Sequence, residues 1–157
     1  MRLSAGILLW RHGPHGPEVL LGHMGGPFWA RKDAAAWTIP KGEHAPDDDP
    51  FASACREFAE EIGCPVPASE FADLGEVRQS SGKVVRAWAA TGDLDPATAA
   101  SNTFELEWPP RSGRTQSFPE LDRVEWFDLA TAAAKIVVAQ RAFLDRLSER
   151  LGDSADL

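Results

Sequence analysis

Two short apolar runs near the start of the chain predict a pair of β-strands. Residues 3–10 (LSAGILLW) and 18–23 (EVLLGH) are rich in aliphatic side chains and carry few charges, as strands of a sheet do. Between them, residues 12–17 (HGPHGP) contain two glycines and two prolines, which favour a turn. The sequence therefore predicts a β-hairpin in this region.

The next segment has a helical period. Asp49 is a suitable N-cap and Pro50 suits the first helical position, while Gly63 followed by Pro65 predicts the end of the helix. Apolar side chains recur three or four residues apart between these ends, as on the buried side of an amphipathic helix. They are Phe51, Ala54, Cys55, Phe58 and Ile62.

The second half of the chain alternates β-like runs with turn-rich stretches. Strands are predicted at residues 71–79, 83–91, 103–108 and 123–128. A closing amphipathic helix is predicted over residues 135–150, from the spacing of Ile136, Phe143, Leu144 and Leu147. Strands interrupted by two helices predict an α/β fold, with a mixed sheet and helices on its faces. We assign residues 1–151 to a single domain and residues 152–157 to a short C-terminal tail.

The composition suits one globular domain. The 157 residues are 43% hydrophobic and 25% charged, which is enough for a sizeable core. No apolar run reaches the about 18 residues of a membrane span, and the first residues resemble a strand rather than a secretory signal, so we expect a cytoplasmic protein without membrane contact. The net charge of −8 argues against broad binding of a nucleic-acid backbone. Cys55 and Cys64 predict buried thiols rather than a disulfide framework or a zinc site.

Three carboxylates on the predicted helix stand close together. Glu57, Glu60 and Glu61 fall at positions i, i+3 and i+4, so their side chains lie within about 100° of one another around the helix axis. Like charges at this spacing oppose helix formation, whereas a hard divalent cation that prefers oxygen ligands would turn the repulsion into binding. The cluster therefore predicts a site for Mg²⁺ or Mn²⁺.

This helix lies within a longer motif that resembles the signature of the Nudix hydrolases. That signature is Gly-x5-Glu-x7-Arg-Glu-U-x-Glu-Glu-x-Gly-U, where U is a bulky aliphatic residue, and six of its seven non-aliphatic positions match. The departures are Asp48 in place of Glu, and Phe58 and Cys64 at the aliphatic positions. The matching stretch is Gly42-x5-Asp48-x7-Arg56-Glu57-Phe58-x-Glu60-Glu61-x-Gly63-Cys64.

The resemblance implies a fold and an activity. The fold is an α/β/α sandwich with a mixed β-sheet, in which the signature forms a loop-helix-loop beside the sheet. The activity is hydrolysis, dependent on Mg²⁺ or Mn²⁺, of a phosphoanhydride bond in a nucleoside diphosphate linked to another group. The expected substrate and partner is a nucleotide, either a dinucleoside polyphosphate or a nucleoside triphosphate.

The same resemblance implies roles for the residues of the motif. Glu57, Glu60 and Glu61 match the metal-binding glutamates, and any one of them can instead orient or deprotonate the attacking water. Arg56 is expected to hold neighbouring carboxylates in place rather than to contact phosphate. Gly42 is placed with the metal site because a glycine lets the backbone approach a cation closely.

Further candidates lie outside the motif. Relatives carry another carboxylate in a place similar to that of Glu120, which is therefore a candidate fourth ligand or general base, in competition with Glu105 and Glu107. Lys41 belongs to a Pro-Lys-Gly turn like those of relatives acting on nucleotides. Lys83 lies in a Gly-Lys-Val-Val stretch that resembles a hairpin of the dinucleoside tetraphosphate hydrolases. Both lysines are expected to hold the phosphates that do not react.

The remaining aromatic, basic and histidine residues complete the expectations from the sequence. Phe28, Trp29 and Trp88 offer flat surfaces on which a nucleobase can stack. The basic loop 109–114 (PPRSGR) is a distinctive insertion without an assigned role. The histidines show no metal spacing and are expected in solvent; they are His12, His15, His23 and His44.

Two other functions fit the same motif. One is a catalytically degenerate Nudix-fold protein that serves as a nucleotide-binding or regulatory module. Its only support is the departure from the signature at Asp48 and Cys64. The other is an isomerase of prenyl diphosphates, for which the expected additional histidine and cysteine set is missing from the sequence. The sequence does not choose among nucleotide substrates and does not indicate an oligomeric state.

Overall fold

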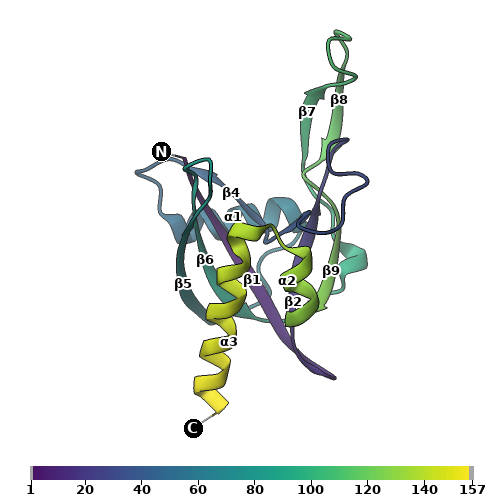
Figure 1. The fold of residues 1–157 in the computed structure, drawn as a ribbon. Coiled ribbons are helices and arrows are strands. Elements are labelled where there is room, and N and C mark those ends of the chain that lie inside the picture. Colours follow the sequence, from purple (N-terminus) through teal and green to yellow (C-terminus); the bar gives the residue numbers. More distant parts are fainter. Residues whose placement is uncertain (1, 156–157) are drawn as a thin grey trace.

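The structure is a computed structural model that describes the backbone of residues 2–155 and the side chains of residues 2–152. Its elements follow one another along the chain as shown in Figure 1. The strands of the main sheet are β1 (Leu3–Gly13), β2 (Gly16–Met24), β3 (Trp37–Thr38), β4 (Lys41–His44), β5 (Phe71–Arg78), β6 (Val84–Thr91) and β9 (Leu121–Asp128). A separate hairpin consists of β7 (Thr103–Glu107) and β8 (Thr115–Pro119). The helices are α1 (Pro50–Ile62), α2 (Leu129–Lys135) and α3 (Arg141–Ala155), with short 3-10 turns at Pro96–Thr98 and Val138–Gln140.

The main sheet has seven strands and is mixed. Its central path runs β3-β2-β1-β6-β5, with β4 paired to β1 and β9 paired to β2. Strand β1 pairs with β6 in parallel from Leu3 opposite Val84 to Trp10 opposite Thr91, and the other pairings are antiparallel. The predicted hairpin is confirmed, because the antiparallel pairing of β1 and β2 closes at Gly13 and Gly16.

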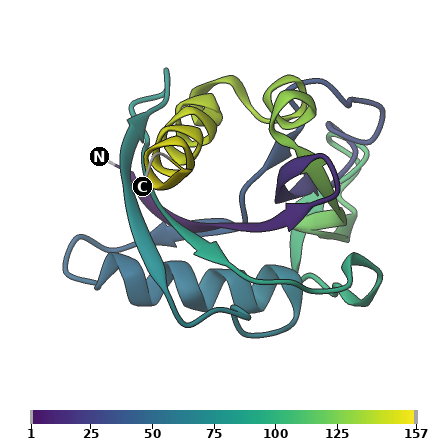
Figure 2. The ribbon, with the colours of Figure 1, turned by 90° about the horizontal axis from the view of Figure 1, so that it is seen from below.

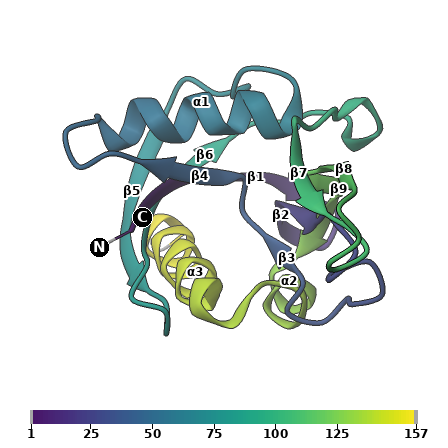
Figure 3. The same ribbon diagram turned by 90° about the horizontal axis from the view of Figure 1, so that it is seen from above.

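Helices cover both faces of this sheet. Figures 2 and 3 show α1 on one side and α3 with α2 on the other. Ala54, Phe58 and Ile62 of α1 belong to one buried apolar cluster, and Phe143 and Leu147 of α3 belong to the other. The expected α/β/α sandwich is therefore confirmed.

The ends of α1 follow the predicted chemistry. Asp49 caps the helix by accepting a hydrogen bond from the backbone N–H of Phe51 at 3.3 Å, and Pro50 is the first helical residue. Gly63 ends it with φ of 92°, a left-handed conformation that glycine adopts without strain. Phe58 is fully buried, while Cys55 and Cys64 are half-buried free thiols against the same apolar cluster.

The C-terminal helix differs from its prediction. Instead of one helix over residues 135–150, α2 ends at Lys135 and α3 begins at Arg141. Between them Ile136 forms a β-bridge with Trp37, and the N–H of Val137 donates to the carbonyl of Trp37 at 2.8 Å. These β-branched residues gain more from pairing with β3 than from helical backbone. Helix α3 then continues through Ala155, so the boundary assigned at residue 151 falls within it.

The hairpin of β7 and β8 stands away from the body of the molecule (Figure 1). Its strands pair from Thr103 opposite Pro119 to Glu107 opposite Thr115, and the basic loop 109–114 is its tip. Strands β3, β4 and β8 lie outside the predicted runs, because two of them are very short and β8 (TQSFP) is mostly polar and ends in proline. None of the described helices has the length and apolar character needed to cross a membrane.

Candidate active site

A cavity of about 420 Å³ lies between β4, α1 and the base of the β7–β8 hairpin. Figure 3 shows α1 and β4 side by side, with the hairpin near the C-terminal end of α1. Six of the residues selected from the sequence line this cavity: Lys41, Gly42, Glu57, Glu61, Lys83 and Glu120. Arg2, Glu43 and Asn102 complete the lining. The fold thus gathers candidates that lie up to 79 positions apart, from Lys41 to Glu120.

Glu61 is the most deeply placed of the carboxylates. Its side chain is buried and accepts a hydrogen bond from the backbone N–H of Lys41 at 2.8 Å. Burial raises the pKa of Glu61 to about 8, and the nearby carboxylates of Glu120 and Glu57 add to the shift, although the N–H and the ammonium of Lys41 oppose it. In the absence of a cation this site therefore favours the neutral acid.

Glu57 lies against the backbone of the loop before it. A Cβ atom at position 42 would stand 2.0 Å from the Cδ of Glu57, so only glycine leaves room for this carboxyl group. Burial raises the pKa of Glu57, and the charges of Glu60 and Glu120 raise it further. Arg56 opposes this shift; its Nη2 lies 3.5 Å from the Oε1 of Glu57.

Glu120 is placed by backbone hydrogen bonds at the base of the hairpin. Its N–H donates to the carbonyl of Asn102 at 2.9 Å, and its carbonyl accepts from the N–H of Gly25 at 2.9 Å. Its competitors Glu105 and Glu107 are exposed hairpin residues outside the cavity lining. The carboxylate that shares the cavity with the α1 glutamates is therefore that of Glu120.

Glu60 and Arg56 are the two candidates that do not line the cavity. Both are exposed on α1, and Glu60 influences the site through its charge on Glu57. The backbone carbonyl of Glu60 accepts from the N–H of Asn102 at 2.9 Å, which ties the end of α1 to the start of the hairpin.

Two lysines supply positive charge to the cavity. Burial lowers the pKa of Lys41 to about 8 and the neighbouring Lys83 lowers it further, while Glu61 and Glu43 oppose the shift. The Nζ of Lys83 lies 3.8 Å from the Oε1 of Glu43, which also pairs with Arg2 at 2.6 Å. Two ammonium groups held close together in a partly closed cavity favour an anionic ligand.

Sequence reasoning missed Arg2, Glu43 and Asn102. Arg2 directly precedes β1, and Leu3 of β1 pairs with His44 of β4. This pairing brings the side chain of Arg2 to that of Glu43, which accepts a hydrogen bond from it. No local pattern in the sequence marks that pairing. Glu43 had one available signal, its position directly after Gly42 in the motif.

The donor set suits a hard cation. The side chains of Glu57, Glu61 and Glu120 line one cavity. The negative charges of neighbouring carboxylates contribute to the raised pKa of Glu57 and of Glu61, and a bound cation would offset this repulsion. In the conformation described for residues 2–152, no three His, Cys, Asp or Glu side chains converge closely enough to hold a metal ion.

Two residues take positions that the sequence did not predict. Asp48, which replaces the signature glutamate, is exposed and accepts from the N–H of Ala45 at 2.9 Å, so it closes the turn before α1. The expectation that the histidines are solvated is wrong for His23, which is fully buried. Its ring lies 2.8 Å from the carboxylate of Asp122, which is distant in the sequence, and 2.6 Å from the carbonyl of Lys32 in the loop that follows β2.

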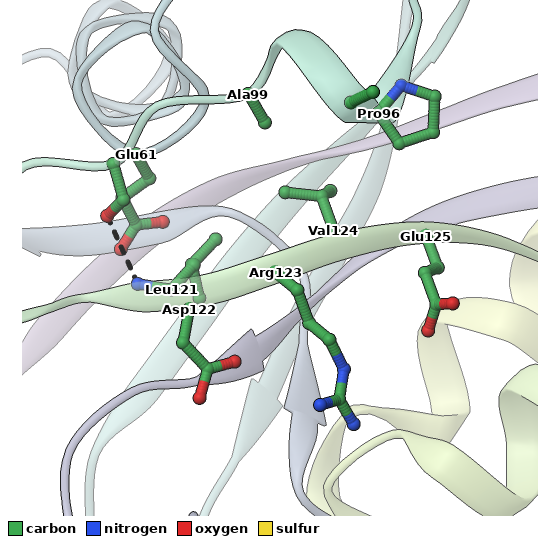
Figure 4. A pocket seen from close by; sticks show the side chains of 10 residues that line it. Glu61, Pro96, Ala99, Leu121, Asp122, Arg123, Val124 and Glu125 are labelled. Carbon is green, nitrogen blue, oxygen red and sulfur yellow. Dashed lines mark hydrogen bonds between the residues drawn. The ribbon is translucent and has the colours of Figure 1, made fainter.

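A second cavity of about 370 Å³ adjoins the first, and Glu61 lines both. Figure 4 shows its walls, which are β9 and the segment from Pro96 to Ser101. The dashed line marks the hydrogen bond from the N–H of Leu121 to the Oγ of Ser101, 3.1 Å long. This bond joins the segment to β9 at the wall nearest Glu61.

Comparison with known families decides the assignment. The model of the NUDIX domain matches residues 1–147, nearly the whole chain. The chain belongs to the Nudix family. The resemblance seen in the motif at residues 42–64 is thereby confirmed, and Nudix enzymes generally use divalent metals. No curated protein matches the chain.

Solved structures agree with this Nudix assignment at the level of the fold. A C. elegans Ap4A hydrolase in a binary complex is 21% identical, with 96% of this chain and 98% of that chain covered and a TM-score of 0.66. The NUDIX domain of Shewanella oneidensis NrtR in complex with ADP ribose is 18% identical, with coverage of 95% and 87% and a TM-score of 0.64. The C-terminal domain of mouse MUTYH in complex with human PCNA is 20% identical, with coverage of 97% and 90% and a TM-score of 0.63.

Proposed function

We propose that this Nudix protein is a hydrolase dependent on Mg²⁺ or Mn²⁺ that cleaves a phosphoanhydride bond in a nucleoside diphosphate linked to another group. A dinucleoside polyphosphate or a nucleoside triphosphate is the proposed substrate. One observation carries the proposal: Glu57, Glu61 and Glu120 share a cavity with Lys41 and Lys83. Carboxylates that hold a cation, beside ammonium groups that hold phosphate, are the groups that phosphoanhydride hydrolysis needs.

The residues divide into two proposed groups. Oxygens of Gly42, Glu57, Glu61 and Glu120 would hold the metal, together with Glu60 once its exposed side chain turns toward the cavity. When bound, a divalent cation neutralises phosphate charge and lowers the pKa of a bound water. Lys41 and Lys83 would hold the phosphates that stay in place during the reaction.

Proton transfer and positioning are assigned to side chains at the same cavity. Glu120 enters it from the hairpin rather than from α1, so we propose that it takes the proton of the attacking water, with a glutamate of α1 as the competing base. Arg56 contacts Glu57 at 3.5 Å, and we propose that it holds that carboxylate in place.

The test is a panel of dinucleoside polyphosphates and nucleoside triphosphates with Mg²⁺ and with Mn²⁺, with products separated by chromatography. Glu57→Gln and Glu61→Gln are expected to lower kcat by about 10²-fold or more, because each removes a charge at the reaction centre. Glu105→Gln is the matched control, since Glu105 is exposed outside the cavity. Full activity in both cavity variants, with the melting temperature unchanged, would refute these roles.

The competing proposal is a module that binds nucleotides without cleaving them. The structure of the Shewanella oneidensis NrtR domain was solved with ADP ribose, so a related fold holds such a ligand. Tight binding of a nucleotide by this chain, with no product formed in either metal, would favour that reading. Retention of Glu57, Glu60 and Glu61 in the motif favours the enzyme.

A further inference from the structure

An aromatic surface on the β7–β8 hairpin and the loop after β2 has no part in either apolar cluster of the core. We call it the aromatic ledge and define it as the side chains of Phe28 and Trp108. The ring of Phe28 is 61% exposed, and its centroid lies 5.5 Å from that of Trp108 with the rings edge to face at 80°. Such a pair leaves ring surface available for a flat ligand, and Phe28 is one of two large hydrophobic side chains that are exposed in the described part of the chain.

The ledge is attached to the walls of the cavity. Trp108 directly follows β7, and Asn102, which directly precedes β7, lines the cavity. Phe28 lies three residues after Gly25, whose N–H donates to the carbonyl of Glu120. Phe104 of β7 packs 3.0 Å from the position of a Cβ on Gly26, so the loop and the hairpin lie against each other. At about 3.3 Å per residue, Trp108 stands about 20 Å from Asn102 along the strand.

The tip beyond the ledge is basic. Arg111 and Arg114 are exposed, and among the side chains that the structure describes neither forms an ion pair. Their charge is opposite to the net charge of −8 of the whole chain. Guanidinium groups in the loop that directly follows Trp108 suit a ligand that combines a flat base with phosphate or sugar oxygens.

We infer that the aromatic ledge binds the distal nucleobase of a dinucleoside polyphosphate whose phosphates occupy the cavity. The inference rests on the proposed function, because it takes the cavity as the place of the reacting phosphates. A ligand that touches both places must extend over about 20 Å, and a molecule with a nucleoside at each end of a polyphosphate has that extended form. The ledge then discriminates two-ended substrates from nucleoside triphosphates.

The test compares kcat/KM for diadenosine tetraphosphate and for ATP. Loss of a stacked base costs about tenfold in affinity, so Phe28→Ala and Trp108→Ala are expected to lower kcat/KM for diadenosine tetraphosphate about tenfold and to change that for ATP less than twofold. Trp108→Phe keeps a ring and is expected to retain most of the activity. Val138→Ala is the control, because Val138 is 62% exposed, lies in the 3-10 turn before α3 and does not line the cavity.

Several outcomes separate this inference from the proposed function. If the protein hydrolyses neither compound, the proposed function fails. Calorimetric titration with diadenosine tetraphosphate still tests the ledge, because Phe28→Ala should raise its dissociation constant about tenfold.

Equal losses of kcat/KM for both compounds, or no loss for diadenosine tetraphosphate, would overturn the inference. A dimer that Phe28→Ala converts to monomer would overturn it too, since a second copy of the chain would then cover the ledge. Phe28→Ala alone carries the comparison if Trp108→Ala does not fold, because Phe28 is 61% exposed.

Discussion

At the scale of single residues, Gly42 shows how closely the site is packed. A methyl group at this position would stand 2.0 Å from the Cδ of Glu57, so Gly42→Ala is expected to push that carboxyl group out of place. Because a displacement of about 1 Å at a catalytic group can cost about 10²-fold, we predict a fall in kcat of that order with little change in melting temperature. Steady-state kinetics and thermal unfolding measure the two effects.

The control for this prediction is Gly152→Ala. A Cβ on Gly152 meets no atom within 4 Å, so this variant adds the same methyl group without a contact. If Gly42→Ala remained as active as Gly152→Ala, the position of the Glu57 carboxyl group would not matter for the reaction.

The same scale shows what the sequence could reveal of the site. Helical spacing places Glu57 and Glu61 together, and the resemblance of the motif to the Nudix signature adds Gly42. Glu43 and Arg2 come together only because two strands pair in a particular register, and register depends on the whole sheet. Sequence reasoning therefore found the residues of the motif and, through the family resemblance, Lys41, Lys83 and Glu120. It missed Arg2 and Glu43, which strand pairing brings together.

At the scale of elements, a short 3-10 turn supports the segment that leads into the site. Gln140 is fully buried; its Oε1 accepts from the N–H of Ile39 at 3.1 Å, and its Nε2 donates to the Oγ1 of Thr38 at 2.9 Å. Lys41, two residues after Ile39, donates its N–H to Glu61. The turn thus positions the segment from β3 to β4 and, through it, Glu61.

We predict that Gln140→Leu lowers the free energy of unfolding by about 1–3 kcal/mol, because it leaves the buried N–H of Ile39 without a partner. Chemical denaturation measures the change. Gln79→Leu is the comparison, since Gln79 is half-buried and no hydrogen bond of its side chain is present in the structure of residues 2–152. Equal stability of the two variants would show that the bond from Ile39 contributes nothing.

Elements with a regular pattern were predicted and those without one were not. The apolar period of α1 and the aliphatic runs of β1 and β6 are strong local signals, and all three elements are present. Strand β3 has two residues and exists because β2 and Ile136 pair with it. The same pairing breaks the predicted closing helix, so both errors have one tertiary cause.

At the scale of the whole molecule, the buried acid at the site makes stability depend on pH. The pKa of Glu61 is raised from 4.5 to about 8 in the folded protein. Between those values the folded chain holds a proton that the unfolded chain has released, so the free energy of unfolding declines as pH rises, and this contribution is complete below about pH 4.5. The lowered pKa of Lys41, about 8, acts in the opposite direction from pH 8 toward 10.5.

We therefore predict that the metal-free protein loses stability between pH 5 and pH 8, and that Glu61→Gln flattens this part of the profile. Denaturation with a chelator present, at several pH values, measures it. The carboxylates with a lowered pKa, among them Asp33 and Asp73, titrate below this window and do not confuse the result. A profile that is the same in both proteins would contradict the burial of a protonated Glu61.

The β7–β8 hairpin contributes no residue to either apolar cluster of the core, and Asn102 and Glu120 fix it at its base. Its length and side chains can therefore vary with little effect on folding, while the carboxylates on α1 stay where they are. We therefore expect Nudix proteins with similar carboxylates on α1 to differ in ligand preference through this hairpin, and its residues are the first to compare between two such proteins.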